Sequence, residues 1–129
     1  MYRWVQHTGE LEIAIEAPTE REVFADALAA LVELLEIEGD ADEDRAIEAT
    51  APDRPALLAA WLEELVFGAE VDAFEPVALR QLELGPHSLK AVVEGHYGEP
   101  SPVVKAVTYH RLAFEAADSG YRATVVLDV

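Results

Sequence analysis

Cysteine is absent from the sequence, which excludes disulfide bonds, thiolate metal sites and thiol nucleophiles. No apolar run approaches the roughly 20 residues that a membrane span needs. The N-terminus, MYRWVQHTGE, has no apolar run behind a basic stretch, so it lacks the pattern of a secretory signal. P-loop, Rossmann and nucleophile-elbow motifs are missing as well. We therefore expect a soluble cytoplasmic protein without a membrane partner, and not an ordinary nucleotide-binding enzyme.

Positive charge is scarce. The chain has 9 lysine and arginine residues against 26 aspartate and glutamate residues, and its formal net charge is −17. Docking directly on RNA or DNA requires clustered basic residues, so we expect no direct nucleic-acid binding. An acidic surface suits metal cations or a basic protein partner, although solubility is the simplest account of most of these charges.

Hydrophobic periodicity predicts strands and helices in alternation, followed by two hairpins. Thr19 and Glu22 form a capping box at the start of a helix that Gly39 ends. Asp53 caps a second helix that runs to about Gly68. The predicted strands cover residues 11–17, 45–51, 77–84, 88–97, 103–116 and 121–129.

This order of elements predicts an α+β fold. We expect a compact single domain, residues 1–129, in which two helices pack on a largely antiparallel sheet. A composition of 51% hydrophobic and 27% charged residues is typical of a folded chain. By pattern alone, the closing segment TVVLDV is an edge strand that carries the charge of Asp128 at its tip.

Neither the acidic segment at residues 40–44 nor the spacing of the histidines predicts a metal site. The segment DADED, residues 40–44, resembles the start of a calcium-binding loop, but Arg45 replaces the required glycine and Ala51 replaces the closing glutamate. The histidines show none of the spacings typical of zinc sites; they are His7, His87, His96 and His110.

Three short stretches carry the remaining candidate chemistry. HTGE contains Glu10, KAVTYH contains Lys105, and the closing LDV contains Asp128. Each of these side chains could simply be an exposed charge on a strand. Carboxylate oxygens from two strand ends would instead suit a hard divalent cation. Spacing alone does not show whether Glu10 and Asp128 meet.

At these stretches the sequence resembles the archease family, and the resemblance covers the whole chain. The segments that carry it include YRWVQHTGELEI, VKAVTYHRLAFE and YRATVVLDV. The resemblance implies an α+β domain built on a strand–helix–strand–strand theme. It also implies an accessory protein rather than an enzyme. Such a protein helps the RtcB-type RNA ligase to become guanylylated and to turn over repeatedly in tRNA splicing and RNA repair.

The resemblance also implies a divalent-metal site. The family motif His-Thr-Ala-Asp reads His-Thr-Gly-Glu here, so the metal-ligand position holds Glu10. The second acidic ligand falls on Asp128, the backbone oxygen of Val129 completes the protein ligands, and the functional lysine falls on Lys105. Glutamate adds a methylene and a rotatable bond, and calcium tolerates flexible geometry better than magnesium does. We therefore expect calcium first, with magnesium or manganese as alternatives.

Two other functions stay open from the residues alone. Glu10 and Asp128 could serve a stand-alone metal-dependent hydrolase that activates a bound water, which turnover by the purified protein alone would reveal. The chain could also be a small-molecule-binding module, and a large apolar pocket away from the acidic tip would favour that function.

Overall fold

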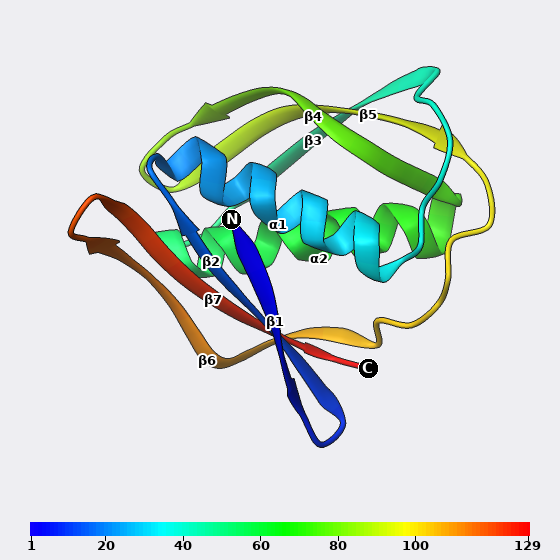
Figure 1. Cartoon of the computed structure of the whole chain (residues 1–129). Helices are drawn as coiled ribbons and strands as arrows, with labels where there is room; N and C mark the ends of the chain where they lie inside the picture. Colours follow the sequence, from blue (N-terminus) through cyan, green and yellow to red (C-terminus); the bar gives the residue numbers. More distant parts are fainter.

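The computed structural model describes residues 1–129 and places two helices between two antiparallel sheets (Figure 1). The elements are β1 (Tyr2–His7), β2 (Glu10–Ala17), α1 (Glu20–Leu34), β3 (Glu43–Thr50), α2 (Arg54–Asp72), β4 (Phe74–Leu84), β5 (Ser88–Tyr97), β6 (Ala106–Ala117) and β7 (Gly120–Asp128). The predicted α+β fold with two helices on antiparallel sheet is confirmed, and the sheet is divided in two. Neither helix is long and apolar enough to cross a membrane.

The four-stranded sheet has the order β1-β2-β7-β6, and all of its neighbouring strands are antiparallel. The prediction that the last strand lies at a sheet edge is therefore wrong, because β7 is paired on both sides. Its burial agrees with an inner position: Val125, Val126 and Leu127 are consecutive, point alternately to the two faces, and are all fully buried. The alternation of residues along one strand does not encode which strands lie beside it.

The three-stranded sheet has the order β3-β5-β4. Helix α1 packs on β2 and β4, and α2 packs on β3, β4 and β6, so both helices contact both sheets. Their starts agree with the prediction. The hydroxyl of Thr19 accepts from the Glu22 amide at 3.1 Å, and the carboxylate of Asp53 accepts from the Ala56 amide at 2.9 Å.

The helix ends differ from the prediction in opposite directions. Helix α1 stops at Leu34, before Gly39, whereas α2 continues past Gly68 to Asp72. The side chain of Arg45 lies over Gly68, at 3.5 Å from the position that a Cβ atom would take. Ala73 then ends α2 in a left-handed conformation with φ of 56°, so the terminating residue is not a glycine and carries no sequence signal.

The first strand was not predicted. β1 precedes the strand that starts near residue 11 and pairs with it across a two-residue turn, with His7 opposite Glu10. Gly9 in this turn has a φ of +71°, a conformation that glycine adopts without strain.

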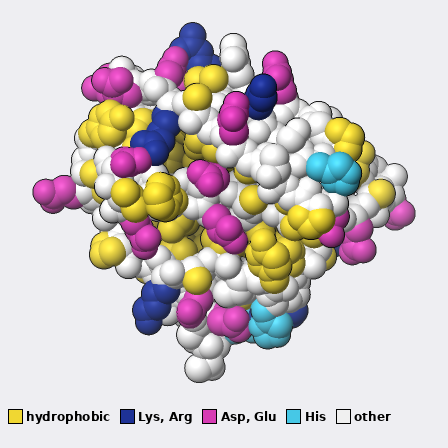
Figure 2. All heavy atoms as spheres, turned by 180° about the vertical axis from the view of Figure 1, so that it is seen from behind, with side chains coloured by type: hydrophobic (Ala, Val, Ile, Leu, Met, Phe, Trp, Pro, Cys, Tyr) yellow, Lys and Arg dark blue, Asp and Glu magenta, His cyan; other side chains and the backbone are white.

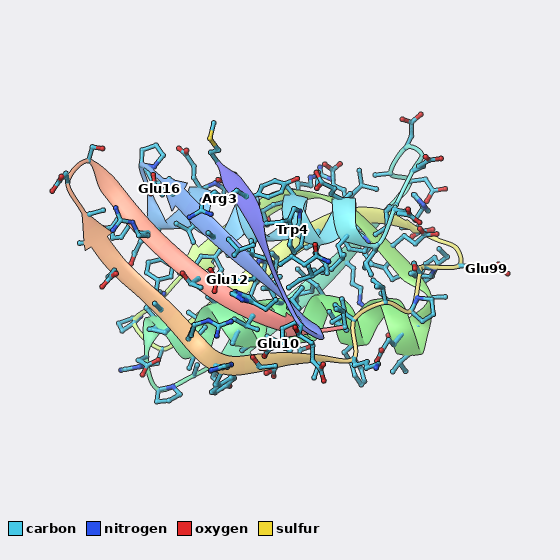
Figure 3. All side chains as sticks on the ribbon, turned by 60° about the horizontal axis from the view of Figure 1, so that its bottom comes forward. Arg3, Trp4, Glu10, Glu12, Glu16 and Glu99 are labelled. Carbon is cyan, nitrogen blue, oxygen red and sulfur yellow. The ribbon has the colours of Figure 1, made fainter.

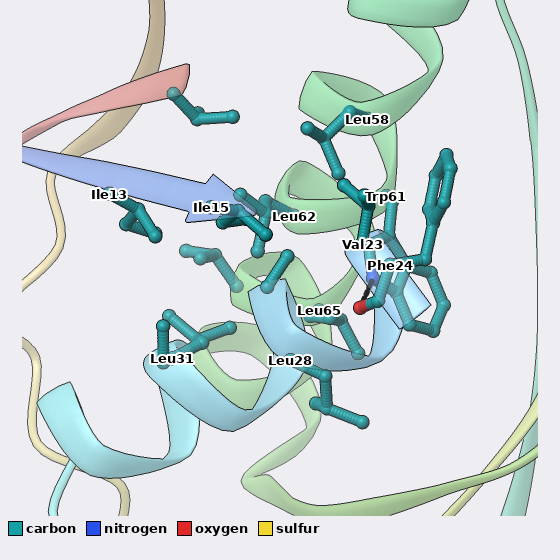
Figure 4. Packing of buried hydrophobic residues seen from close by; sticks show 14 of the residues in the cluster. Ile13, Ile15, Val23, Phe24, Leu28, Leu31, Leu58, Trp61, Leu62 and Leu65 are labelled. Carbon is teal, nitrogen blue, oxygen red and sulfur yellow. Dashed lines mark hydrogen bonds between the residues drawn. The ribbon is translucent and has the colours of Figure 1, made fainter. Parts of the chain in front are cut away.

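The hydrophobic core lies between the sheets, and the two helices supply half of its 26 buried residues (Figure 4). Trp61 of α2 and Phe24 of α1 are both fully buried, with ring centroids 6.4 Å apart. The indole N–H of Trp61 donates to the backbone carbonyl of Phe24 at 3.0 Å. No charged or polar residue is buried, so the charges of this acidic chain lie at the surface. Figure 2 shows acidic side chains spread over the face seen from behind.

Glu33 of α1 joins β1 to the helix layer. It accepts hydrogen bonds at 2.8 Å from both the Tyr2 hydroxyl and the Trp4 indole N–H. Burial raises the pKa of Tyr2 above its usual value of 10.0, and the carboxylate of Glu33 raises the pKa further because it favours the protonated hydroxyl.

We expect this shift to appear as a pH-dependent stability. Because the folded-state pKa of Tyr2 is raised, its contribution is complete below about pH 10 and is lost as the pH rises through the folded-state value. The free energy of unfolding should therefore fall more steeply above pH 10 in the wild type than in Tyr2→Phe, as measured by denaturant titration at several pH values. Parallel curves for the two proteins would contradict this account of Tyr2.

Candidate functional site

Glu10 and Asp128 meet across neighbouring strands. Glu10 begins β2, Asp128 ends β7, and the two residues lie directly opposite each other. Figure 3 shows Glu10 at the end of the four-stranded sheet, where β1 turns into β2. The sequence patterns alone could not establish this contact, because the two residues lie near opposite ends of the chain.

The backbone hydrogen bonds show what kind of pair they form. The carbonyl of Asp128 accepts from the amide of Lys105, on the β6 side of β7, at 2.8 Å. The next amide, that of Val129, turns to the other side and donates to the Gly9 carbonyl at 3.3 Å. Asp128 therefore makes its ladder bonds to the β6 side, and Glu10 and Asp128 form a pair without mutual backbone hydrogen bonds. In such pairs the Cα atoms lie about 4.5 Å apart and the side chains are closest.

Lys105 is brought to the same end of the sheet by its backbone. It directly precedes β6, whose first residue, Ala106, lies opposite Asp128. Its side chain is exposed and forms no ion pair. The ammonium group of Lys105 therefore does not neutralise Glu10 or Asp128 in this structure.

A bulge in β6 adds residues that the sequence analysis missed. Between the pairs Thr108–Val126 and Ala113–Thr124, β6 contains three more residues than β7. Within this bulge, Arg111 has a φ of 56°, which is uncommon for a residue other than glycine. Neither glycine nor proline marks the bulge in the sequence.

The bulge directs two basic side chains toward β2. His110 Nδ1 lies 3.4 Å from Glu10 Oε2, and Arg111 Nε donates to Glu12 Oε1 at 3.1 Å. His7 of β1 approaches the same Glu12 oxygen at 3.6 Å. Glu12 thus has two basic neighbours, whereas Glu10 has one partner that is charged only when protonated.

Known proteins are similar to this chain along its whole length. A model of the archease protein family matches residues 2–129. The chain belongs to the archease family. Its relatives include archeases of Methanosarcina acetivorans, 34% identical over 140 residues, and Methanopyrus kandleri, 30% identical over 137 residues. The alignment covers 99% of this chain and 95% of the first relative, and 97% and 96% for the second.

Two solved structures are similar to it. The solution structure of a Methanobacterium thermoautotrophicum protein has a TM-score of 0.76 and 26% identity, and the match covers 99% of this chain and 98% of that chain. A crystal structure from Thermotoga maritima, described as an archease and possible chaperone, has a TM-score of 0.64 and 20% identity, covering 100% and 98% of the two chains. At 20% identity, the similarity to the Thermotoga maritima structure shows a shared fold alone.

Glu10 and Asp128 provide two of the oxygen ligands that a cation site would need. Like charges directly opposite each other in an antiparallel sheet are destabilising, and a divalent cation between them would remove that repulsion. Hard cations prefer such oxygen ligands. No group of three or more histidine, cysteine, aspartate or glutamate side chains is arranged to hold a metal. A bound ion would therefore need the backbone oxygen of Val129 and ligands from elsewhere.

The surface hollows give little support to a small-molecule function. The most apolar hollow has a volume of about 260 Å³ and lies between the end of α2 and the loop before β6, with Val66, Ala69, Pro102 and Val104 in its lining. Pockets for drug-sized ligands have volumes of about 300–1,000 Å³. Its lining includes Val104, the neighbour of Lys105, but neither Glu10 nor Asp128.

Proposed function

We propose that this archease family member is an accessory protein that activates an RtcB-type RNA ligase. It promotes guanylylation and repeated turnover of the ligase during tRNA splicing and RNA repair. The observation that carries the proposal is the pairing of Glu10 with Asp128, at the positions where the family resemblance implies metal ligands. The net charge of −17 suits a basic, RNA-binding partner better than RNA itself.

Each residue at the sheet end has a distinct role in this proposal. The carboxylates of Glu10 and Asp128 and the backbone oxygen of Val129 would hold a divalent cation, with calcium expected first and magnesium or manganese as alternatives. Such a cation supplies positive charge for phosphate oxygens. Lys105, which forms no ion pair within the chain, is free to neutralise a phosphate on the partner.

The test is a guanylylation assay of the ligase with and without this protein. We expect Asp128→Ala to reduce the stimulated rate by at least about tenfold, the lower end of what losing a metal-site partner costs. Lys105→Ala should have an effect of similar size, because losing a hydrogen bond to a charged group costs about 1.5–3 kcal/mol, which is tenfold or more. Asp118→Ala is the matched control, since Asp118 lies in the turn between β6 and β7, at the other end of β7. Undiminished stimulation by both site variants would sink the proposed roles.

The hydrolase alternative has its own outcome in the same experiment. If the purified protein alone hydrolysed phosphate esters in the presence of calcium, magnesium or manganese, and Asp128→Ala abolished that turnover, the stand-alone function would replace the accessory one.

A further inference from the structure

The outer edge of β1 presents backbone groups that nothing in the chain satisfies. The Met1 amine donates to the Glu16 carbonyl at 2.8 Å, and the Glu16 amide donates to the Met1 carbonyl at 2.9 Å. Because ladder bonds alternate along an antiparallel strand, Arg3, Val5 and His7 turn their backbone groups toward β2. The amides and carbonyls of Tyr2, Trp4 and Gln6 then point away from the sheet, and none has a backbone partner outside the regular elements.

The other three sheet edges are each protected against pairing. β6 carries the bulge that contains Arg111. β4 has two register shifts and contains Pro76, and four of the eight residues of β3 are charged. Bulges, prolines and charges are common means of blocking edge-to-edge association. β1, with the sequence YRWVQH, has only one such residue, Arg3.

The space beside this edge indicates the chemistry of an occupant. A hollow of about 610 Å³ lies on the last turns of α1 and is lined by Ala29, Val32, Glu33, Glu36, Ile37 and Glu38. Glu33 is also the residue that binds Tyr2 and Trp4, so the hollow adjoins the inward-facing side of β1. Figure 3 shows Trp4 beside β1 on the side away from β2. Side chains of an added strand would meet three apolar residues, Ala29, Val32 and Ile37, and an acidic rim there.

We infer that β1 binds an extended segment of the partner protein by strand addition. This inference rests on the proposed function, and the partner is the ligase. Main-chain hydrogen bonds to Tyr2, Trp4 and Gln6 supply the affinity, and apolar and basic side chains that enter the hollow supply the specificity. The added strand would be the third strand from β7, at about 14 Å. It would therefore hold the partner against the end of the sheet that carries Glu10.

A second copy of this chain is a poor occupant of the same edge. Two copies each carry a net charge of −17, and such charge opposes self-association. The rim of the hollow is acidic, so a second acidic chain would add repulsion beside the edge. A basic partner segment would instead be attracted to this acidic rim.

Amide hydrogen exchange tests the inference without a mutation. In the free protein the amides of Trp4 and Gln6 should exchange fast, while those of Arg3 and Val5 are protected by β2. With the ligase bound, we expect protection of Trp4 and Gln6 to rise at least tenfold, with Arg3 and Val5 little changed. Unchanged exchange at Trp4 and Gln6 in a saturated complex would overturn the inference.

Substitutions provide an independent test through the dissociation constant of the ligase complex. Gln6→Pro removes one outward amide and is compatible with an edge strand, whereas Gln6→Ala keeps the amide. Glu36→Lys reverses a charge in the hollow, and Glu99→Lys reverses an exposed charge in the loop after β5. We expect at least tenfold weaker binding for Gln6→Pro and Glu36→Lys, and less than twofold change for the two controls.

The outcomes separate the inference from the function beneath it. If the wild type stimulates the ligase while Gln6→Pro and Glu36→Lys bind as tightly as their controls, strand addition is wrong and the proposed function stands. If the wild type neither binds nor stimulates the ligase, both are overturned. A wild type that dimerises through β1 in light scattering, with the dimer lost in Gln6→Pro, would assign the edge to a second copy instead.

Discussion

Trp61→Ala is expected to lower the free energy of unfolding by about 3–5 kcal/mol, the usual cost of truncating a buried aromatic residue to alanine. Trp61 is fully buried on α2 and packs against Phe24 of α1. Because both helices lie between two sheets, the surrounding side chains are held from both sides and can collapse only partly into the space left behind. A loss of this size is a large fraction of the stability of a typical small domain.

Trp61→Phe separates the volume of the side chain from its hydrogen bond. Phenylalanine keeps most of the ring but loses the N–H that donates to the buried carbonyl of Phe24. The Phe24 carbonyl keeps its helical bond from the Leu28 amide, so the variant loses only the net worth of one hydrogen bond, about 0.5–1.5 kcal/mol. It should therefore lie between the wild type and Trp61→Ala. Chemical denaturation of the three proteins measures the difference. A loss below about 1 kcal/mol for Trp61→Ala would show that the contact between α1 and α2 is not central to the fold.

Local signals predicted much of this fold. The Thr19 and Asp53 caps lie where the sequence placed them, because a cap depends only on residues within one turn. The helical spacing of four apolar residues in the second helix indicates a core-facing stripe, and all four are buried. They are Leu58, Trp61, Leu62 and Leu65. These features need no knowledge of the rest of the chain.

Features that depend on distant residues could not be predicted in the same way. β7 is an inner strand only because β2, from the other end of the chain, pairs with it. β1 has no clear alternation in its six residues, since its inward-facing Tyr2 and Trp4 are amphipathic and are satisfied by Glu33 of α1. The β6 bulge has no glycine to reveal the left-handed residue Arg111.

In the candidate site, too, some features could be predicted from the sequence and others depend on distant residues. The resemblance to archeases gave Glu10, Asp128, Val129 and Lys105, and the structure places all four at one end of one sheet. Neither spacing nor composition could show that Glu10 and Asp128 form a close pair. Nor could they show that His110 contacts Glu10, because that contact depends on three extra residues in β6.

Calcium should stabilise the wild type and should not stabilise Asp128→Asn. A ligand at 100 times its dissociation constant adds about 2.7 kcal/mol to the stability of the state that binds it. With calcium the wild type should be the more stable of the two proteins, and without calcium Asp128→Asn should be. Asp128→Asn removes one of two opposed negative charges, which should make it more stable than the wild type by up to about 1 kcal/mol. A single substitution would thus raise the stability of the apo protein and abolish its response to the cation.

Thermal melting at low salt, with and without calcium, measures both effects. Glu16→Gln is the matched control, since Glu16 lies toward the other end of β2 and is opposite Arg122 rather than a second acid. It should respond to calcium as the wild type does. Glu10→Asp restores the residue that the family motif has and shortens the side chain, so a larger calcium response there would show that the extra methylene weakens the site. Equal stabilisation of the wild type and Asp128→Asn by calcium would place the ion elsewhere on this acidic surface.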